Sequence, residues 1–534
     1  MSKFDLVVTN GNVVTAADVS TCCIGIKDGK IRALAESFTT GELDGAQVID
    51  AEGAYVMPGG IDAHVHLSQD LNTGPHGLGG ECADNFETGS KSAAAGGTTT
   101  IITFATQTRA EEDRSLIHVI KAYNERAEAT GSYVDYGFHI IIVRNDTDVL
   151  EQEMPVLMNE WGVSSCKLFL TYETQRMTDS QLLDVMFAAK KNSMTTMIHA
   201  ENGDMIQWLT EPDKLEKKGM VAPYYHALSR PPLVESEATN RAIALAQLIQ
   251  NPILFVHVGS ALGARNIRKA QTMGLPVYAE TCPQYFHLTW EDLKRFHSPT
   301  CFENSKMICS PPPPPDTSDQ EELFVGLENG TFTIYSSDHC PFRYDDPRGK
   351  PSGVLEDAAS MEGEHHCTGD ELQSLLKRKQ GSFRLIPNGI PGVETRLPLL
   401  YTGALSTGRI TPQKFVELTS TNPAKLYGLY PRKGAIMPGS DADLVIWHPE
   451  NSFMGFNLTN SMLHHNADYT PYEGMEFTNW PRYTILRGKV IWADGEIQGK
   501  PRDGQYLKRG PSKLVRGAAK VTQDPRRVAT WLYE

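Results

Sequence analysis

The chain has 534 residues and a mass of 59.0 kDa, which is enough for a large core and more than one domain. A formal net charge of −15 argues against nucleic acid or an anionic membrane as the main partner. The sequence has no apolar run long enough to cross a bilayer and no signal-peptide pattern at its start. Its nine scattered cysteines predict reduced thiols, and we therefore expect a cytoplasmic protein.

Both ends of the chain have the sequence pattern of short β-strands separated by tight turns. Near the N-terminus, Asn10-Gly11 and Asp28-Gly29 each predict a two-residue hairpin turn. Similar β-rich stretches return at 439–447 and 483–497. We predict that residues 1–56 and 434–497 together form one small β-sandwich domain.

The middle of the chain alternates short β-rich runs with amphipathic stretches such as 115–129, 179–192 and 237–250. Eight strands alternating with helices predict an α/β fold, a TIM-like (β/α)8 barrel over residues 57–433. An open doubly wound sheet is the alternative. The eight predicted strands are 57–64, 98–104, 133–143, 164–172, 194–200, 252–258, 275–281 and 332–338.

Two further segments do not follow this alternation. Residues 343–383 are charged and glycine-rich, and they are predicted to be an inserted surface loop. Residues 498–534 form a polar tail, which is interpreted either as an arm onto another subunit or as a solvated tail.

Potential metal ligands and one lysine fall at or near the ends of five predicted strands. In a barrel of this kind, catalytic groups lie at the carboxyl ends of the strands. Residues i and i+2 of a strand point to the same side, so two of the histidines can face one metal ion. Any one of the histidines alone would more simply be a core residue, but together they indicate a metal site. The residues are His64, His66, Lys167, His199, His257 and Asp338.

Lys167 is the most informative member of this set. Strand alternation places it on one face with Ser165 and Phe169, while Cys166 and Leu168 occupy the other. A charged lysine inside a barrel is costly, so its amine should lose its proton or find a partner. A neutral amine can react with carbon dioxide to form an anionic carbamate suited to bridging two divalent metals. A lysine that reaches solvent at the barrel mouth is the alternative.

Several motifs together resemble the dihydropyrimidinase/hydantoinase family of cyclic amidohydrolases. They occur in the family's order and span roughly residues 4–495. HAENGDM, AETCPQY and IPNGIPGVETR are most similar to the eukaryotic dihydropyrimidinases. The other motifs are GGIDAHVH, SSCKLFLTY, FVHVGS, YSSDHCPF and NPAKLYGLYPRKGAIMPGSDADLVIW.

This resemblance implies a site with two zinc ions per subunit. His64, His66 and Asp338 would bind one ion, and His199 and His257 the other. Lys167, as N6-carboxylysine, would bridge them together with a hydroxide. The resemblance further implies that Tyr172 orients the substrate and stabilises the oxyanion, that Asp338 transfers the proton, and that Ser310 and Asn388 hold the amide edge of the ring through their backbone groups.

The implied reaction is zinc-dependent hydrolytic opening of 5,6-dihydrouracil or 5,6-dihydrothymine to N-carbamoyl-β-amino acids, as in pyrimidine degradation. Hydantoin, allantoin or another cyclic imide is the alternative substrate. Dihydroorotases carry an arginine two residues after H-x-H, whereas this chain has Ser68, so a small neutral cyclic ureide or imide is expected. A catalytically inactive scaffold is the non-enzymatic alternative, and the complete ligand set argues against it. Members of the family are usually homotetramers.

Overall fold

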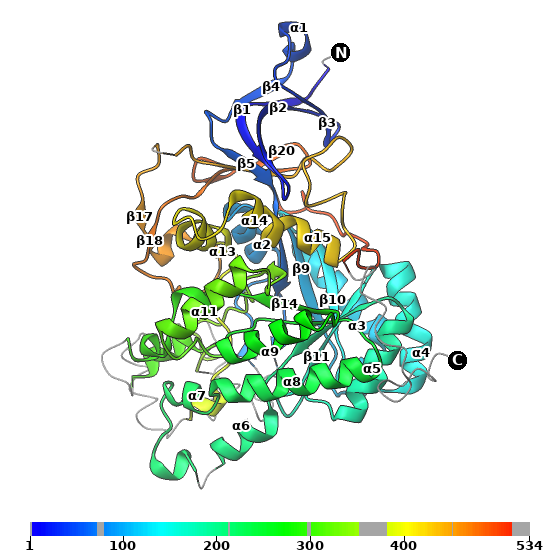
Figure 1. The fold of residues 1–534 in the computed structure, drawn as a ribbon, viewed down its shortest axis with the longest axis vertical. Coiled ribbons are helices and arrows are strands. Elements are labelled where there is room, and N and C mark those ends of the chain that lie inside the picture. The colour runs from blue at the N-terminus through cyan, green and yellow to red at the C-terminus, as the bar shows by residue number, and fades with distance from the viewer. Residues whose placement is uncertain are drawn as a thin grey trace.

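The computed structural model describes residues 3–71, 80–211, 214–295, 301–351, 382–450 and 452–514. Most of the predicted insertion at 343–383 lies outside these residues. Figure 1 shows a sheet-rich end, drawn in blue and orange, above a larger body in which strands are surrounded by helices.

The larger body is an eight-stranded parallel barrel, as the alternating sequence pattern predicted. Its strands follow one another in chain order around the sheet. A bridge between Val65 and His339 brings the last strand back to the first and nearly closes the barrel. The strands are β6 (Gly60–Val65), β9 (Thr98–Thr106), β10 (Asp135–Ile141), β11 (Ser165–Phe169), β12 (Thr195–His199), β13 (Ile253–Phe255), β14 (Val277–Thr281) and β15 (Ile334–Tyr335).

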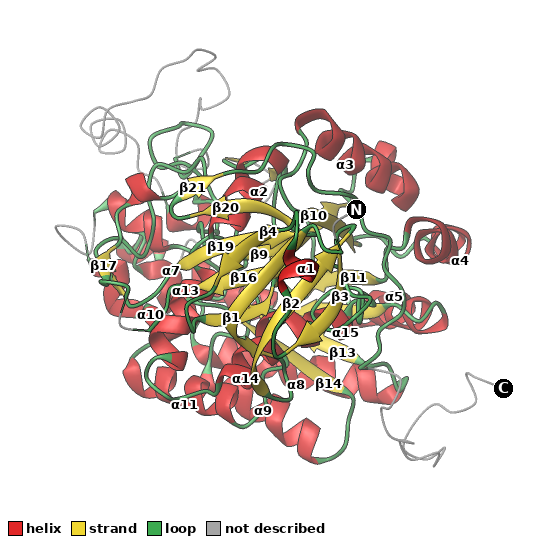
Figure 2. Ribbon diagram, turned by 90° about the horizontal axis from the view of Figure 1, so that it is seen from above, coloured by secondary structure: helices red, strands yellow, loops and turns green. Residues whose placement is uncertain are grey.

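Helices cover the outside of this barrel (Figure 2). The strands are buried on both faces, and apolar residues make up most of each, with buried polar residues such as Asp62, His139 and Lys167 among them. On β11, Cys166 and Leu168 pack in the layer between strands and helices, whereas Phe169 packs inside the barrel. The main helices are α2 (Phe86–Ala95), α3 (Leu116–Thr130), α4 (Thr147–Val156), α5 (Asp179–Lys191), α8 (Pro232–Leu248), α9 (Ala261–Thr272) and α11 (Thr317–Glu328).

The two chain ends share a nine-stranded sheet at the other end of the molecule. The N-terminal strands β1 and β5 lie at its centre, and β5 pairs with the C-terminal strand β16. We therefore propose that 1–56 and 434–497 form one domain and 57–433 the barrel domain. The strands are β1 (Leu6–Val14), β2 (Val19–Lys27), β3 (Lys30–Ala35), β4 (Gln47–Asp50), β5 (Tyr55–Pro58), β16 (Leu444–Trp447), β19 (Pro481–Leu486), β20 (Lys489–Ala493) and β21 (Glu496–Ile497).

One of the two predicted hairpin turns is correct and the other is wrong. Asp28 and Gly29 both have positive φ and join β2 to β3, as a two-residue turn requires. Asn10-Gly11 instead lies within β1, where the pairing with β2 shifts register between Val8 and Gly11. Asn10 has a φ of 52°, so the same left-handed preference produces a bulge instead of a turn.

The described part of the C-terminal tail packs against the barrel of its own chain. Arg509 is buried and donates to Ser165 Oγ at 3.1 Å and to the carbonyl of Phe138. Burial lowers the pKa of the Arg509 guanidinium to about 10. The described tail is therefore not wholly solvated, because at Arg509 it supplies a donor that the barrel interior uses, although neighbours such as Lys508 are exposed.

Replacing Arg509 with methionine should destabilise the fold. The change removes the donor of the Phe138 carbonyl and one of two partners of the Ser165 hydroxyl, which keeps its contact with Nδ1 of His139. Leaving a buried acceptor without its donor should lower the free energy of unfolding by about 1–3 kcal/mol. Thermal or urea unfolding would measure this loss. The exposed neighbour Lys508, changed to methionine, is the matched control and should leave the unfolding midpoint unchanged. Equal stability of the two variants would contradict this role for the tail.

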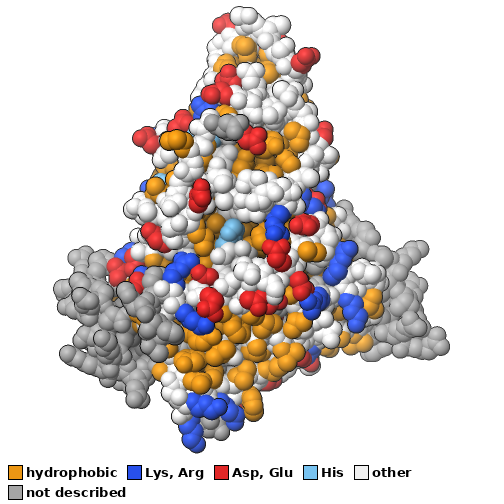
Figure 3. All heavy atoms as spheres, turned by 60° about the vertical axis from the view of Figure 1, so that its left-hand side comes forward, with side chains coloured by type: hydrophobic (Ala, Val, Ile, Leu, Met, Phe, Trp, Pro, Cys, Tyr) orange, Lys and Arg blue, Asp and Glu red, His pale blue; other side chains and the backbone are white. Residues whose placement is uncertain are grey.

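Figure 3 shows one face of the molecule, where hydrophobic side chains gather over the lower half and charged side chains are interspersed above them. None of the helices in the described ranges is long and apolar enough to span a bilayer.

Candidate metal centre

The first two histidines lie where β6 ends, and their Nε2 atoms converge on one carboxylate. Nε2 of His64 is 3.0 Å from Oδ1 of Asp338, and Nε2 of His66 is 3.5 Å from the same oxygen. Asp338 reaches this point from the chain that follows β15, the neighbour of β6 across the barrel closure. Residues 272 positions apart in sequence therefore meet at one point.

Lys167 projects from β11 into the same point. Its Nζ lies 2.8 Å from Nε2 of His64, and the residue is 2% exposed. The rings of Phe104 and Phe169 flank the amine at 4.4 and 5.0 Å from their centroids. The lysine is thus inside the barrel and does not extend to solvent, which excludes the alternative of a lysine at the mouth.

His199 ends β12 and His257 follows β13, and their rings are 4.4 Å apart between centroids. His257 is also 5.4 Å from the ring of His64. One ligand atom each from His64, His257 and Asp338 lies within 4.8 Å of the others, close enough to share a metal ion. His64 and Asp338 were assigned to one ion and His257 to the other, so the two predicted ligand sets lie together in one compact centre.

The backbone is left-handed at three of the site residues. Tyr172, His257 and Asp338 have φ values of 65°, 38° and 51°. Residues without β-branching tolerate this region at a cost, and such conformations cluster at functional sites. Each of the three follows a barrel strand and turns the chain away from the strand direction there.

Three polar residues that the sequence analysis did not identify hold the histidine rings. Nδ1 of His64 is 2.5 Å from Oε1 of Glu280, and Nδ1 of His66 is 2.7 Å from Oε1 of Gln69. These contacts leave the Nε2 atoms of both rings facing Asp338. A hydrogen bond at the second ring nitrogen is the usual way in which a metal-binding imidazole is oriented.

Glu201 orients His199 in the same way, through a 2.7 Å contact between its Oε2 and Nε2 of the ring. Its other oxygen accepts from Arg230 at 3.3 Å. Burial opposes ionisation of Glu201, but the charge of Arg230 and the bond to His199 lower the pKa to about 2. The spacing His199-Ala-Glu201, two residues apart at a strand end, is the signal that could have identified this pair.

The electrostatics of the centre favour a neutral amine at Lys167, a neutral ring at His66 and an anionic carboxylate at Asp338. His64 is the exception, because burial and the charge of Lys167 oppose its protonation but the carboxylates of Glu280 and Asp338 raise its pKa. Burial lowers the pKa of the Lys167 amine and lowers that of His66 to about 4. Burial alone would raise the pKa of Asp338, but His64 and hydrogen bonds from both histidines hold it well below its usual range. Neutral imidazoles and a carboxylate are the ligand forms that divalent metals require.

A second group of convergent carboxylates lies elsewhere, at Asp135, Asp441 and Asp443. Nζ of Lys433 is 2.6, 2.9 and 2.5 Å from them, in that order. The ammonium already occupies the position that a cation would take, so these residues form an internal ion-pair cluster.

The residues predicted to bind the ring lie beside the metal centre and are bonded to one another. Nδ2 of Asn388 donates to the hydroxyl of Tyr172 and to Oγ of Ser310, both at 3.1 Å. All three line the same cavity as His66, Lys167, His199, His257 and Asp338. Burial raises the pKa of Tyr172 to about 12, so its hydroxyl keeps its proton at neutral pH.

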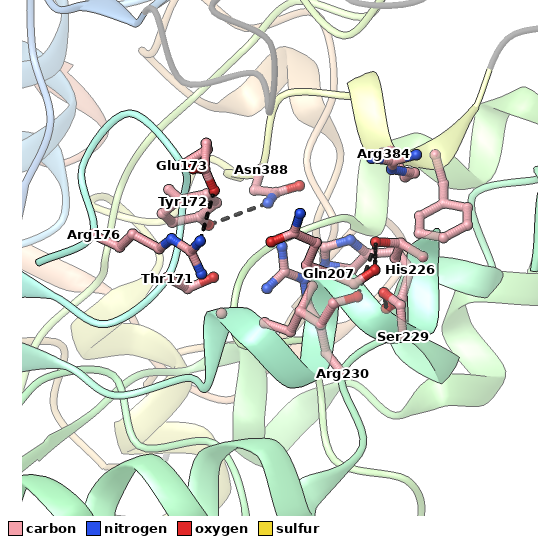
Figure 4. Close-up of a pocket in the computed structure, with 14 residues that line it drawn as sticks. Thr171, Tyr172, Glu173, Arg176, Gln207, His226, Ser229, Arg230, Arg384 and Asn388 are labelled. Atoms are coloured by element: carbon pink, nitrogen blue, oxygen red, sulfur yellow. Dashed lines mark hydrogen bonds and ion pairs between the residues drawn. The ribbon is translucent and has the colours of Figure 1, made fainter. Parts of the chain in front are cut away.

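Among the described residues that line this cavity, Lys167 is the only lysine and there is no arginine. Ser68 does not line the cavity, whereas Gln69, its neighbour, does. An adjoining cavity holds Arg176, Arg230 and Arg384 (Figure 4). Tyr172 and Asn388 line both cavities, so the hydrogen bond between them lies at the boundary.

Comparison with known proteins agrees with this fold. The amidohydrolase family model matches residues 55–213 and 301–491. The D-hydantoinase of Ralstonia pickettii is 39% identical over 507 residues, covering 95% of this chain and 99% of that protein. A solved dihydropyrimidinase structure from Brevibacillus agri is 34% identical with a TM-score of 0.82, covering 95% of this chain and 99% of that one.

The L-hydantoinase structure from Arthrobacter aurescens is more distant, at 27% identity and a TM-score of 0.77, with coverage of 95% and 100%. The fold and site define a barrel hydrolase of the kind that uses divalent metal. The chain belongs to the amidohydrolase family.

Proposed function

We propose that this protein is a zinc-dependent cyclic amidohydrolase that opens the ring of 5,6-dihydropyrimidines to N-carbamoyl-β-amino acids. The observation that carries the proposal is the convergence of His64, His66 and Asp338 beside the buried amine of Lys167. A relative of 39% identity named D-hydantoinase and a solved structure named dihydropyrimidinase support a cyclic ureide as substrate.

The donor set of the centre fits two divalent ions. We propose that His64, His66 and Asp338 hold one, that His199 and His257 hold the other, and that Lys167 as its carbamate lies between them. Carbamate formation joins the neutral amine to carbon dioxide and releases one proton, and the lowered pKa of Lys167 favours it. When bound, such ions polarise a carbonyl and lower the pKa of water.

The chain's own groups would carry the remaining tasks. The carboxylate of Asp338 would accept a proton from the attacking water and deliver it to the ring nitrogen as the C–N bond breaks. The hydroxyl of Tyr172 accepts from Asn388, so its own hydrogen is free to donate to the developing oxyanion. The products gain one hydroxyl at carbon and one hydrogen at nitrogen, which balances one water.

The catalytic cavity favours a neutral ring. Its described lining offers no arginine to pair with a substrate carboxylate, and Gln69 and Gln175 are uncharged. Hydantoin is the second candidate substrate, because several relatives bear the name D-hydantoinase.

Separate incubations with dihydrouracil, hydantoin and allantoin test the proposal. We expect close to two divalent ions per chain by elemental analysis, and dihydrouracil to have the largest kcat/KM. Mass spectrometry of the product should show the mass of the ring plus one water. A metal-free folded protein that opens none of the rings would favour the scaffold interpretation. A larger kcat/KM for hydantoin than for dihydrouracil would make hydantoin the substrate instead of the dihydropyrimidine.

We further propose a cytoplasmic homo-oligomer. Seven of the described cysteines are free thiols, which is typical of a reducing compartment; they are Cys22, Cys23, Cys82, Cys166, Cys282, Cys309 and Cys340. The hydrophobic side chains gathered on one face are of the kind that subunit contacts cover (Figure 3). A mass of one chain in sedimentation equilibrium would refute the oligomer.

A further inference from the structure

Lys350 is a wholly buried lysine outside the metal centre, and its exposed fraction is 0%. Its ammonium donates to three backbone carbonyls, those of Ile308 at 3.0 Å, Pro387 at 2.9 Å and Gly389 at 2.7 Å. An ammonium has three hydrogens, so these bonds use all of them. The described residues offer it no carboxylate partner.

The three carbonyls belong to the two segments that carry the ring-binding residues. Ile308 lies two residues before Ser310, and Pro387 and Gly389 flank Asn388. The same two segments are joined by a bond from the amide of Gly389 to the carbonyl of Ile308 at 3.0 Å. Lys350 therefore holds the backbone on both sides of Asn388 to the backbone that leads into Ser310.

We propose that Lys350 is a positioning residue that sets the distance between the Ser310 and Asn388 segments, and so the fit of the ring's amide edge. This inference rests on the proposed function, in which those two segments hold the ring. Three carbonyl oxygens directed at one point repel one another, and a cation at that point relieves the repulsion. Without it, the two segments would separate and the substrate would bind more weakly.

The protonation state of Lys350 provides a second test, which is the dependence of KM on pH. Burial lowers the pKa of its ammonium to about 7, and the titratable groups that face it are the thiols of Cys309 and Cys340 and the imidazole of His226. The protonated form has three donors, and the neutral amine, which prevails above that pKa, has two donors and no charge. The KM should therefore rise as the pH increases through about 7.

The experiment uses the metal-loaded protein and dihydrouracil. In Lys350→Met, KM should rise at least tenfold while kcat falls less than threefold and metal content stays unchanged. Lys350→Gln keeps an N–H donor and should have an intermediate KM. The control Lys306→Met removes a lysine of the Ser310 segment whose ammonium pairs with Glu303, and its KM should stay within twofold of the wild type.

An unchanged KM in Lys350→Met would refute the proposed positioning role of Lys350. A loss of turnover that is explained by lost metal would refute it as well. If Lys350→Met does not fold, wild type and Lys350→Gln are compared between pH 6 and 8.5. The wild-type KM should rise relative to that of the variant, and parallel profiles would overturn the proposal. Failure of the wild type to open any ring would instead refute the proposed function, and this inference with it.

Discussion

Replacing Lys167 with alanine should remove metal and activity together. The amine lies 2.8 Å from Nε2 of His64 inside the barrel, where no other described lysine lines the cavity. Loss of a bridging ligand should reduce bound metal from about two ions per chain to one or none. Turnover should then fall on the order of 10³-fold or more, which corresponds to about 4 kcal/mol of transition-state stabilisation. Elemental analysis and steady-state kinetics measure both effects.

The matched control is Cys166→Ala, one residue away on the opposite face of β11. It removes core volume between strands and helices, so it should lower stability without changing metal content. Wild-type protein stripped of metal provides a second check, because reconstitution should be slow in carbon dioxide-free buffer and faster with bicarbonate. Full turnover by Lys167→Ala would disprove the carbamate.

Asp338→Asn should separate metal binding from proton transfer. Asparagine keeps an oxygen near Nε2 of His64 and His66 but cannot carry a proton between water and the ring nitrogen. Proton transfer by a positioned group contributes about 10²- to 10⁴-fold, so kcat should fall by that amount while at least one ion remains bound. Kinetics with dihydrouracil and elemental analysis on the same sample measure the two quantities.

Asp346→Asn is the control for this change, because it removes a carboxylate from the following loop that pairs with Arg348. Its kcat should match the wild type. A kcat of Asp338→Asn within threefold of the wild type would assign the proton transfer to another group.

Much of the barrel was predictable because parallel strands buried on both faces are rich in apolar and β-branched residues, and each of the eight predicted runs overlaps an observed strand. The same pattern led to the proposed metal ligands, since His64 and His199 stand at strand ends. The bulge at Asn10-Gly11 was not predictable, because a hairpin turn and a bulge require the same positive φ. The packing of Arg509 was not predictable either, because a polar tail carries no periodic signal.

The amino-acid sequence by itself determined the order of strands and helices, the ligand types and their place at strand ends, because these depend on local periodicity and chemistry. Only the tertiary structure decided which groups orient the ligands. Glu280 meets His64 across 216 residues, and Lys350 joins the segments of Ser310 and Asn388. Such contacts depend on barrel closure and on loops that approach one another in space, and neither leaves a pattern along the chain.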